Sequence, residues 1–130
     1  MKMPASSTPH ADPHALLVLT NLPDAPAAHA LATQLVEARL AACVNILAPC
    51  HSIYRWQAQI ETASEVPLLI KTTTTRYAEL EAAIRHAHPY ELPEIIAVPI
   101  TDGLDAYLGW IAETTTPAAT SASTPATPSC

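Results

Sequence analysis

The chain has 130 residues, 49% of them hydrophobic, so it can bury one sizeable core but is too short for two ordinary domains. Its formal net charge of −6, with only 6 lysines and arginines, excludes the phosphate backbone of a nucleic acid as its partner. The 3 cysteines form no CxxC pair, and no apolar stretch is long enough for a signal peptide or a membrane span. We therefore expect a cytoplasmic protein that does not bind membranes.

Composition divides the chain into three regions. Residues 1–14 mix Pro, Ser, His and Ala, and residues 114–130 form a tail rich in Pro, Ala, Ser and Thr. Neither region has the periodic large apolar side chains that offset the entropy of ordering, so we expect both to be disordered. The domain is predicted at residues 15–113.

The domain opens with a predicted strand, helix and second strand. Residues 16–19 are a continuous apolar run, typical of a buried strand. Asp24 is placed to cap a helix that has Pro26 in its first turn. The apolar stripe of this helix consists of Ala28, Leu31, Leu35 and Ala38. From residue 42 the apolar period becomes two, which predicts a strand that Pro49 bends or interrupts.

A long hairpin is expected next. Its strands are predicted at residues 52–56 and in the return through residues 60–73, and the polar residues 57–59 form its tip. Pro67 cannot donate a hydrogen bond to a neighbouring strand, which places it at an edge, a bulge or an unpaired stretch.

The chain then predicts a second helix, a last strand and a closing helix. Thr75 is the expected N-cap of the helix, and His88 followed by Pro89 ends it. The apolar stripe of this helix consists of Tyr77, Leu80, Ile84 and Ala87. Residues 95–100 predict a buried strand, and residues 104–111 a short helix.

The order β-α-β-β-α-β-α predicts an α+β fold of the ferredoxin-like type, with both long helices on one face of an antiparallel sheet. The other face would still carry Tyr, Trp, Ile and Leu side chains. A monomer would expose too much of this apolar area, so we expect the chain to associate with copies of itself.

His88 and Glu91 are the first candidates for metal ligands. They flank a rigid Pro-Tyr segment. A site of imidazole and carboxylate suits Cu(II) as the first choice of metal and Zn(II) as the second. The alternative is that His88 bonds nearby backbone while Glu91 is solvated. Cys50 and His51 are a second candidate pair, although neighbouring side chains of a strand face opposite ways. Cys43 is expected to be a small buried side chain, and the sequence assigns no role to the terminal Cys130.

Lys71 follows a buried apolar run and is a candidate for binding an anion or small metabolite in a cleft between subunits. An ion pair with Glu65 or Glu94 is the alternative. Four aromatic residues are candidates for the same cleft, or else for anchors of a subunit interface. They are Tyr54, Trp56, Tyr90 and Trp110.

Motifs of common enzymes are absent from the sequence. It contains no GxSxG, HExxH, P-loop or GxGxxG, and a chain with only 2 glycines has no Gly-rich loop for phosphate. We expect no enzymatic activity and no required cofactor. A small enzyme with His88 and Glu91 as acid and base is the alternative.

Five ordered blocks resemble the CutA family of divalent-cation tolerance proteins. They are residues 38–46 (ARLAACVNI), 52–56 (SIYRW), 70–72 (IKT), 88–95 (HPYELPEI) and 107–111 (YLGWI). The resemblance implies a homotrimer whose hairpins pair across subunits, a role in tolerance of divalent cations with copper binding in some members, and no established reaction. CutA domains themselves resemble the PII signal-transduction proteins in fold and trimeric assembly. The alternative is therefore a trimer that binds a metabolite between its subunits and reports it to a protein partner.

The chain departs from the family at four places. Ala58 stands where members commonly have Gly, Pro67 replaces an apolar strand residue, and Cys50-His51 replaces residues typical of a turn. Thr20-Asn21 stands where some members have a Cys, so a metal site that uses that Cys is not expected here.

Overall fold

A computed structural model describes residues 14–118 of the chain. Its elements are β1 (Ala15–Leu22), α1 (Ala25–Glu37), β2 (Cys43–Ile46), β3 (Cys50–Trp56), β4 (Gln59–Thr73), α2 (Tyr77–Ala87), β5 (Ile96–Pro99) and α3 (Asp105–Thr114). This is the predicted order, with the strand after α1 divided into β2 and β3. The disorder predicted for residues 1–13 and 119–130 lies outside the described residues.

The strands form one antiparallel sheet in the order β2-β4-β1-β5. β3 pairs with the part of β4 that extends beyond β2, so β2 and β3 occupy successive positions along the same neighbour. The residues between them, 47–49, are not in a strand, as expected at Pro49. The result is the α+β arrangement of a ferredoxin-like sandwich, as the sequence predicted.

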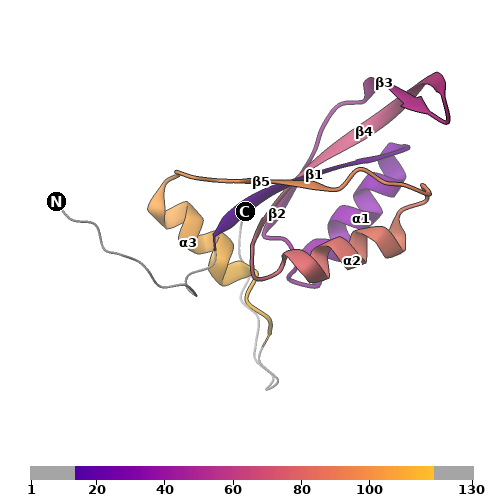
Figure 1. Ribbon diagram of the computed structural model, residues 1–130. Helices are drawn as coiled ribbons and strands as arrows, with labels where there is room; N and C mark the ends of the chain where they lie inside the picture. The colour runs from indigo at the N-terminus through magenta and orange to yellow at the C-terminus, as the bar shows by residue number, and fades with distance from the viewer. Residues whose placement is uncertain (1–13, 119–130) are drawn as a thin grey trace.

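The core lies between the sheet and the two long helices. Figure 1 shows α1 and α2 side by side beneath the sheet and α3 apart from them, at the far end. Alternate residues of β1 and β4 face the long helices, because side chains of a strand point alternately to its two faces. The buried side chains of this core include Val18, Leu22, Leu68, Ile70, Leu35, Leu80 and Ile84.

Both predicted helices form, but only one begins as expected. Asp24 caps α1, and its Oδ1 accepts a hydrogen bond from the Ala27 amide at 2.9 Å. Thr75 is not the cap of α2, which starts after Arg76 with no capping bond from any described side chain. The preceding Thr74 bonds His14 through both its amide and its hydroxyl, and this contact carries the chain through an extra turn.

The outer ends of the two apolar stripes are exposed. Ala38 lies beyond the last helical residue of α1, where it occupies the C-cap position, and Ala87 is the last residue of α2. His88 has extended backbone angles and ends α2, as predicted from the proline that follows it.

The hairpin closes with a two-residue turn between Trp56 and Gln59. Gln57 and Ala58 both have positive φ, 52° and 67°, which is the backbone of a type I′ turn. Pro67 continues β4, and its carbonyl accepts from the Leu47 amide at 2.9 Å. Its missing N–H lies on the same side, so the return bond to Leu47 cannot form, and the pairing of β2 with β4 ends there.

The last strand is paired but not buried, contrary to the prediction for residues 95–100. β5 hydrogen-bonds to β1 alone among the described strands, and all four of its residues are exposed. Among residues 14–118 it is an edge strand, and the described elements cover the second face of the sheet beside it only at one end, where α3 packs Ile111 against Ala15 and Ala42. No other element of this described part buries β5.

We expect Ala58→Gly to raise the free energy of unfolding by about 1 kcal/mol, because glycine adopts positive φ without the steric cost of a Cβ. Urea unfolding at fixed protein concentration measures the change. Ala82→Gly, on the exposed side of α2, is the matched control and should lower stability by about 1 kcal/mol. A loss of stability in Ala58→Gly would contradict the assignment of the turn.

Candidate functional site

The segment after α2, residues 88–94, folds around the His88 side chain and forms a tight corner, the His88 corner. The imidazole is 8% exposed, and its Nε2 lies 2.6 Å from the carbonyl oxygen of Asn21. The Tyr90 amide donates to Nδ1 at 3.2 Å. Because Nδ1 accepts the hydrogen bond from the Tyr90 N–H, this nitrogen carries no proton. The ring proton is therefore on Nε2, which donates it to the carbonyl oxygen of Asn21. The ring thus joins α2 to the end of β1 in one neutral tautomer.

This geometry bears on the metal prediction for His88 and Glu91. Both ring nitrogens of His88 are bonded to backbone, which is the alternative arrangement considered from the sequence, and Glu91 is exposed. Within residues 14–118, no three His, Cys, Asp or Glu side chains gather closely enough to hold a metal ion. Residues 14–118 therefore offer no ready site for a resident metal, and coordination by His88 would require the ring to leave its two backbone partners.

Tyr90 and Glu65 form the polar centre of the same corner. Glu65 is 8% exposed and accepts a hydrogen bond from the Tyr90 hydroxyl. Burial first, and then this bond and the negative charge of Glu65, raise the pKa of Tyr90 to about 12, with smaller contributions from Tyr54 and Asp24. The Tyr90 ring also packs against His88, with ring centres 4.7 Å apart.

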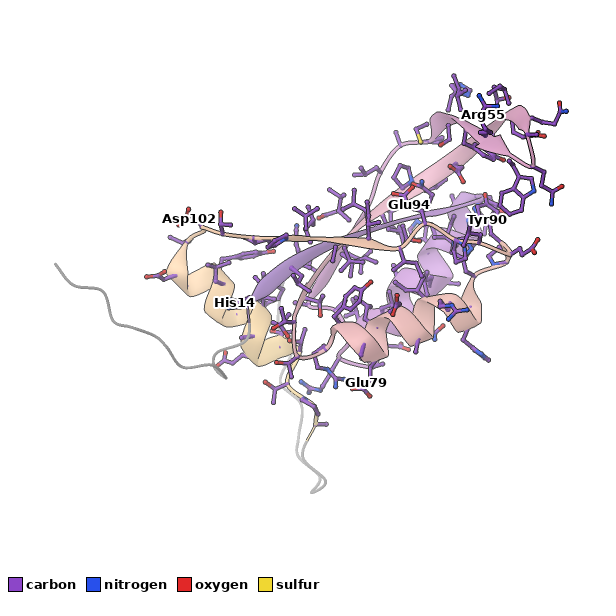
Figure 2. The ribbon with its side chains drawn as sticks, in the orientation of Figure 1. His14, Arg55, Glu79, Tyr90, Glu94 and Asp102 are labelled. Carbon is purple, nitrogen blue, oxygen red and sulfur yellow. The ribbon has the colours of Figure 1, made fainter. Side chains whose placement is uncertain are left out.

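Glu94 completes the attachment of the segment to β1. Its Oε1 accepts from the side-chain amide of Asn21 at 3.1 Å. Figure 2 shows Tyr90 and Glu94 toward the end of the sheet from which the hairpin projects, far from Asp102. The sequence did not predict the contact of Asn21 with Glu94 or the hydrogen bond between Tyr90 and Glu65. No local pattern marks either contact, because the partners are 73 and 25 residues apart along the chain.

Lys71 does not pair with Glu65 or Glu94, the two partners considered from the sequence. Its Nζ donates instead to Oδ1 of Asn45 at 2.6 Å. The lysine lies near the end of β4, opposite Leu17 of β1 and Cys43 of β2. It is half-buried on the sheet face that α1 and α2 leave uncovered.

The predicted cleft residues do not gather into one pocket in this protomer. Tyr54 and Trp56 lie on the hairpin, and Tyr90 lies at its base. Trp110 packs with the α3 cluster at the other end of the sheet. The described hollow between α1 and β2, about 290 Å³, is lined by none of them. A cleft that they share between subunits stays a prediction.

The cysteine predictions can be compared with the strand geometry. Cys50 faces the same side of β3 as Ser52, with Sγ and Oγ 3.9 Å apart, whereas His51 is exposed on the other side. Cys50 and His51 therefore do not chelate one ion in this geometry. Cys43 is buried, as expected, and Cys130 lies outside the described residues.

Comparison with known proteins identifies the family. The family model described as "CutA1 divalent ion tolerance protein" matches residues 16–114. The chain belongs to the CutA1 family. The divalent-cation tolerance protein CutA of Thermus thermophilus is 46% identical over 99 residues, which cover 76% of this chain and 96% of the relative. The resemblance seen in the sequence is confirmed.

Two solved CutA structures show the same fold. CutA1 from the psychrotrophic bacterium Shewanella sp. SIB1 has a TM-score of 0.77 and 46% identity, and covers 83% of this chain and 100% of its own. The periplasmic divalent cation tolerance protein CutA from Archaeoglobus fulgidus has a TM-score of 0.76 and 36% identity, and covers 78% of this chain and 99% of its own. The CutA names describe tolerance proteins and not enzymes.

The compartment of this CutA1 chain is not decided by its family, because one relative is named as periplasmic. The helices among residues 14–118 are all too short or too polar to cross a membrane. The cytoplasmic location stays a prediction.

We expect Tyr90→Phe to lower the free energy of unfolding at pH 7 by about 1–2 kcal/mol, because the buried carboxylate of Glu65 loses a donor. The pKa of Tyr90 is raised to about 12 in the folded state from the ordinary value of 10.0. Its stabilising contribution is therefore present below pH 10 and lost as the pH rises toward 12. Urea unfolding at several pH values measures both effects.

Tyr54→Phe is the control, because the Tyr54 side chain is exposed on the hairpin. It should leave both the stability at pH 7 and its alkaline decline close to those of the wild type. Equal alkaline declines in the wild type and Tyr90→Phe would contradict the role given to the Tyr90 hydroxyl.

Proposed function

We propose that this CutA1 protein serves divalent-cation tolerance as a homotrimer. The observation that carries the proposal is the uncovered face of the sheet. Leu17, Leu19 and Leu69 lie there half-buried, and Ile96 and Val98 of β5 continue the apolar area to the edge. A contiguous apolar face of this kind is typical of a protein interface.

The hairpin adds a second exposed apolar surface. β3 and the first part of β4 project beyond β1, away from the helices (Figure 1). Ile53 and Ile60 are 72% and 60% exposed, and no element in the described part of the chain covers them. An arm of this kind can lie on the uncovered sheet face of a neighbour. Such head-to-tail contacts close into a ring, for which the sequence resemblance implies three copies.

We expect the wild type to sediment as a trimer at low micromolar concentration and Val98→Lys to shift it toward the monomer, because a charge is then placed in the apolar interface. Val36→Lys is the matched control. Val36 and Val98 are 41% and 47% exposed, but Val36 lies on α1, at the hollow between α1 and β2 and not on the proposed interface. A wild type that sediments as a single protomer would refute the proposed assembly.

Binding of divalent cations is the second part of the proposal. The chain carries 12 Asp and Glu against 6 Lys and Arg, and an acidic surface attracts cations. His88 and Glu91 are the proposed ligands, for Cu(II) before Zn(II). Because His88 must first leave Asn21 and Tyr90, we expect the binding to be weak and coupled to opening of the corner.

Calorimetric titration with Cu(II) tests these ligands. Glu91→Gln, an exposed change that leaves the corner intact, and His88→Ala should each raise the Kd for Cu(II) at least about tenfold. His86→Ala, on the exposed side of α2, is the matched control and should bind as the wild type does. Added Cu(II) should also speed hydrogen exchange at the Tyr90 amide. Unchanged copper heats in Glu91→Gln and His88→Ala would overturn the ligand assignment.

A further inference from the structure

Lys71 occupies an unusual position for a charged side chain. Its neighbours in β4, Ile70 and Thr72, are fully buried, so Lys71 points to the opposite face, beside the end of the sheet that α3 covers. On that face it lies in one row with Leu17 of β1 and Val98 of β5. The ammonium group is therefore set within the apolar surface that the proposed trimer covers.

The charge of Lys71 is not balanced within the described part of the chain. Its one described partner is the neutral amide of Asn45, whose Oδ1 lies 2.6 Å from Nζ. The ion pair found among residues 14–118 joins Arg76 to Glu79 and does not include Lys71. An ammonium that loses water without gaining a negative partner is strongly disfavoured.

The Lys71 and Asn45 pair offers only hydrogen-bond donors to its surroundings. Asn45 has given its oxygen to Lys71, which leaves the two protons of its amide nitrogen available. The ammonium keeps two further protons. No described acceptor takes any of these protons, and both side chains lie on the same sheet face, as their β2 and β4 register requires. A cation flanked by a donor-only amide is suited to bind an anion.

We propose that Lys71 and Asn45 bind the carboxylate or phosphate group of a small anion at the subunit interface. The inference rests on the proposed trimer, because covering this face removes the water that now solvates the ammonium. A bound anion supplies the missing charge through short, charge-assisted hydrogen bonds. It also gives the trimer a ligand other than a metal ion, of the chemical class that a metabolite-sensing role requires.

Calorimetry with inorganic phosphate and with succinate, in a zwitterionic buffer containing sodium chloride, tests the proposal. The wild-type protein should show saturable binding of one of the two probes. Lys71→Met should raise its Kd at least about tenfold. Asn45→Asp supplies a carboxylate within the protein, so this variant should also lose the binding and should melt at a higher temperature than the wild type without the anion.

Arg85→Gln is the matched control, because it removes one positive charge from an exposed position on α2. It should bind the probe as the wild type does. Equal binding by the wild type and Lys71→Met would overturn the proposal. So would a wild type that ignores both probes, the result expected if a carboxylate of a neighbouring subunit fills this place.

Sedimentation of the same samples separates the two ideas. A wild-type trimer that ignores both probes refutes the anion site and leaves the proposed assembly standing. A wild-type monomer refutes the assembly on which the site depends.

Discussion

The side chains of each strand point to two faces, but the helices of this protomer cover only one of them. Alternate residues of β1 and of the second half of β4 reach the core beneath α1 and α2. The residues between them, such as Leu17 and Leu69, stay half-buried on the other side, where α3 reaches only one end. The exposed edge strand β5 and the bare hairpin follow from this imbalance. The proposed trimer is the means by which the second face gains a cover.

The corner around His88 determines where the open edge of the sheet lies. Residues 88–94 are tied to β1 through Asn21 and to β4 through Glu65, and β5 begins directly after them. The family string HPYELPEI thus has a structural role that accounts for its imidazole and its phenol without a metal ion. A metal ion that His88 coordinates must first displace these bonds. The proposed cation binding is therefore weak, unlike that of a protein folded around a resident metal.

The uncovered face combines two properties that rarely coexist. Apolar side chains favour its burial, whereas Lys71 opposes burial until its charge is matched. Asn45 orients the ammonium but does not neutralise it. In the proposed trimer this composition would link assembly to the proposed anion. The proposed cation binding at His88 concerns a different part of the molecule.

The sequence by itself determined the order of elements, the core stripes, the cap at Asp24, the end of α2 before Pro89 and the break at Pro49, because each depends on periodicity or on the backbone limits of nearby residues. The sequence predicted the tip of the hairpin at residues 57–59 but not the type of its turn. Only the tertiary structure decided that Thr75 is no cap, that β5 is exposed, and that Glu65 binds Tyr90 and not Lys71. These features depend on contacts between segments that are distant in the sequence, and a local sequence pattern does not identify the partner in such a contact.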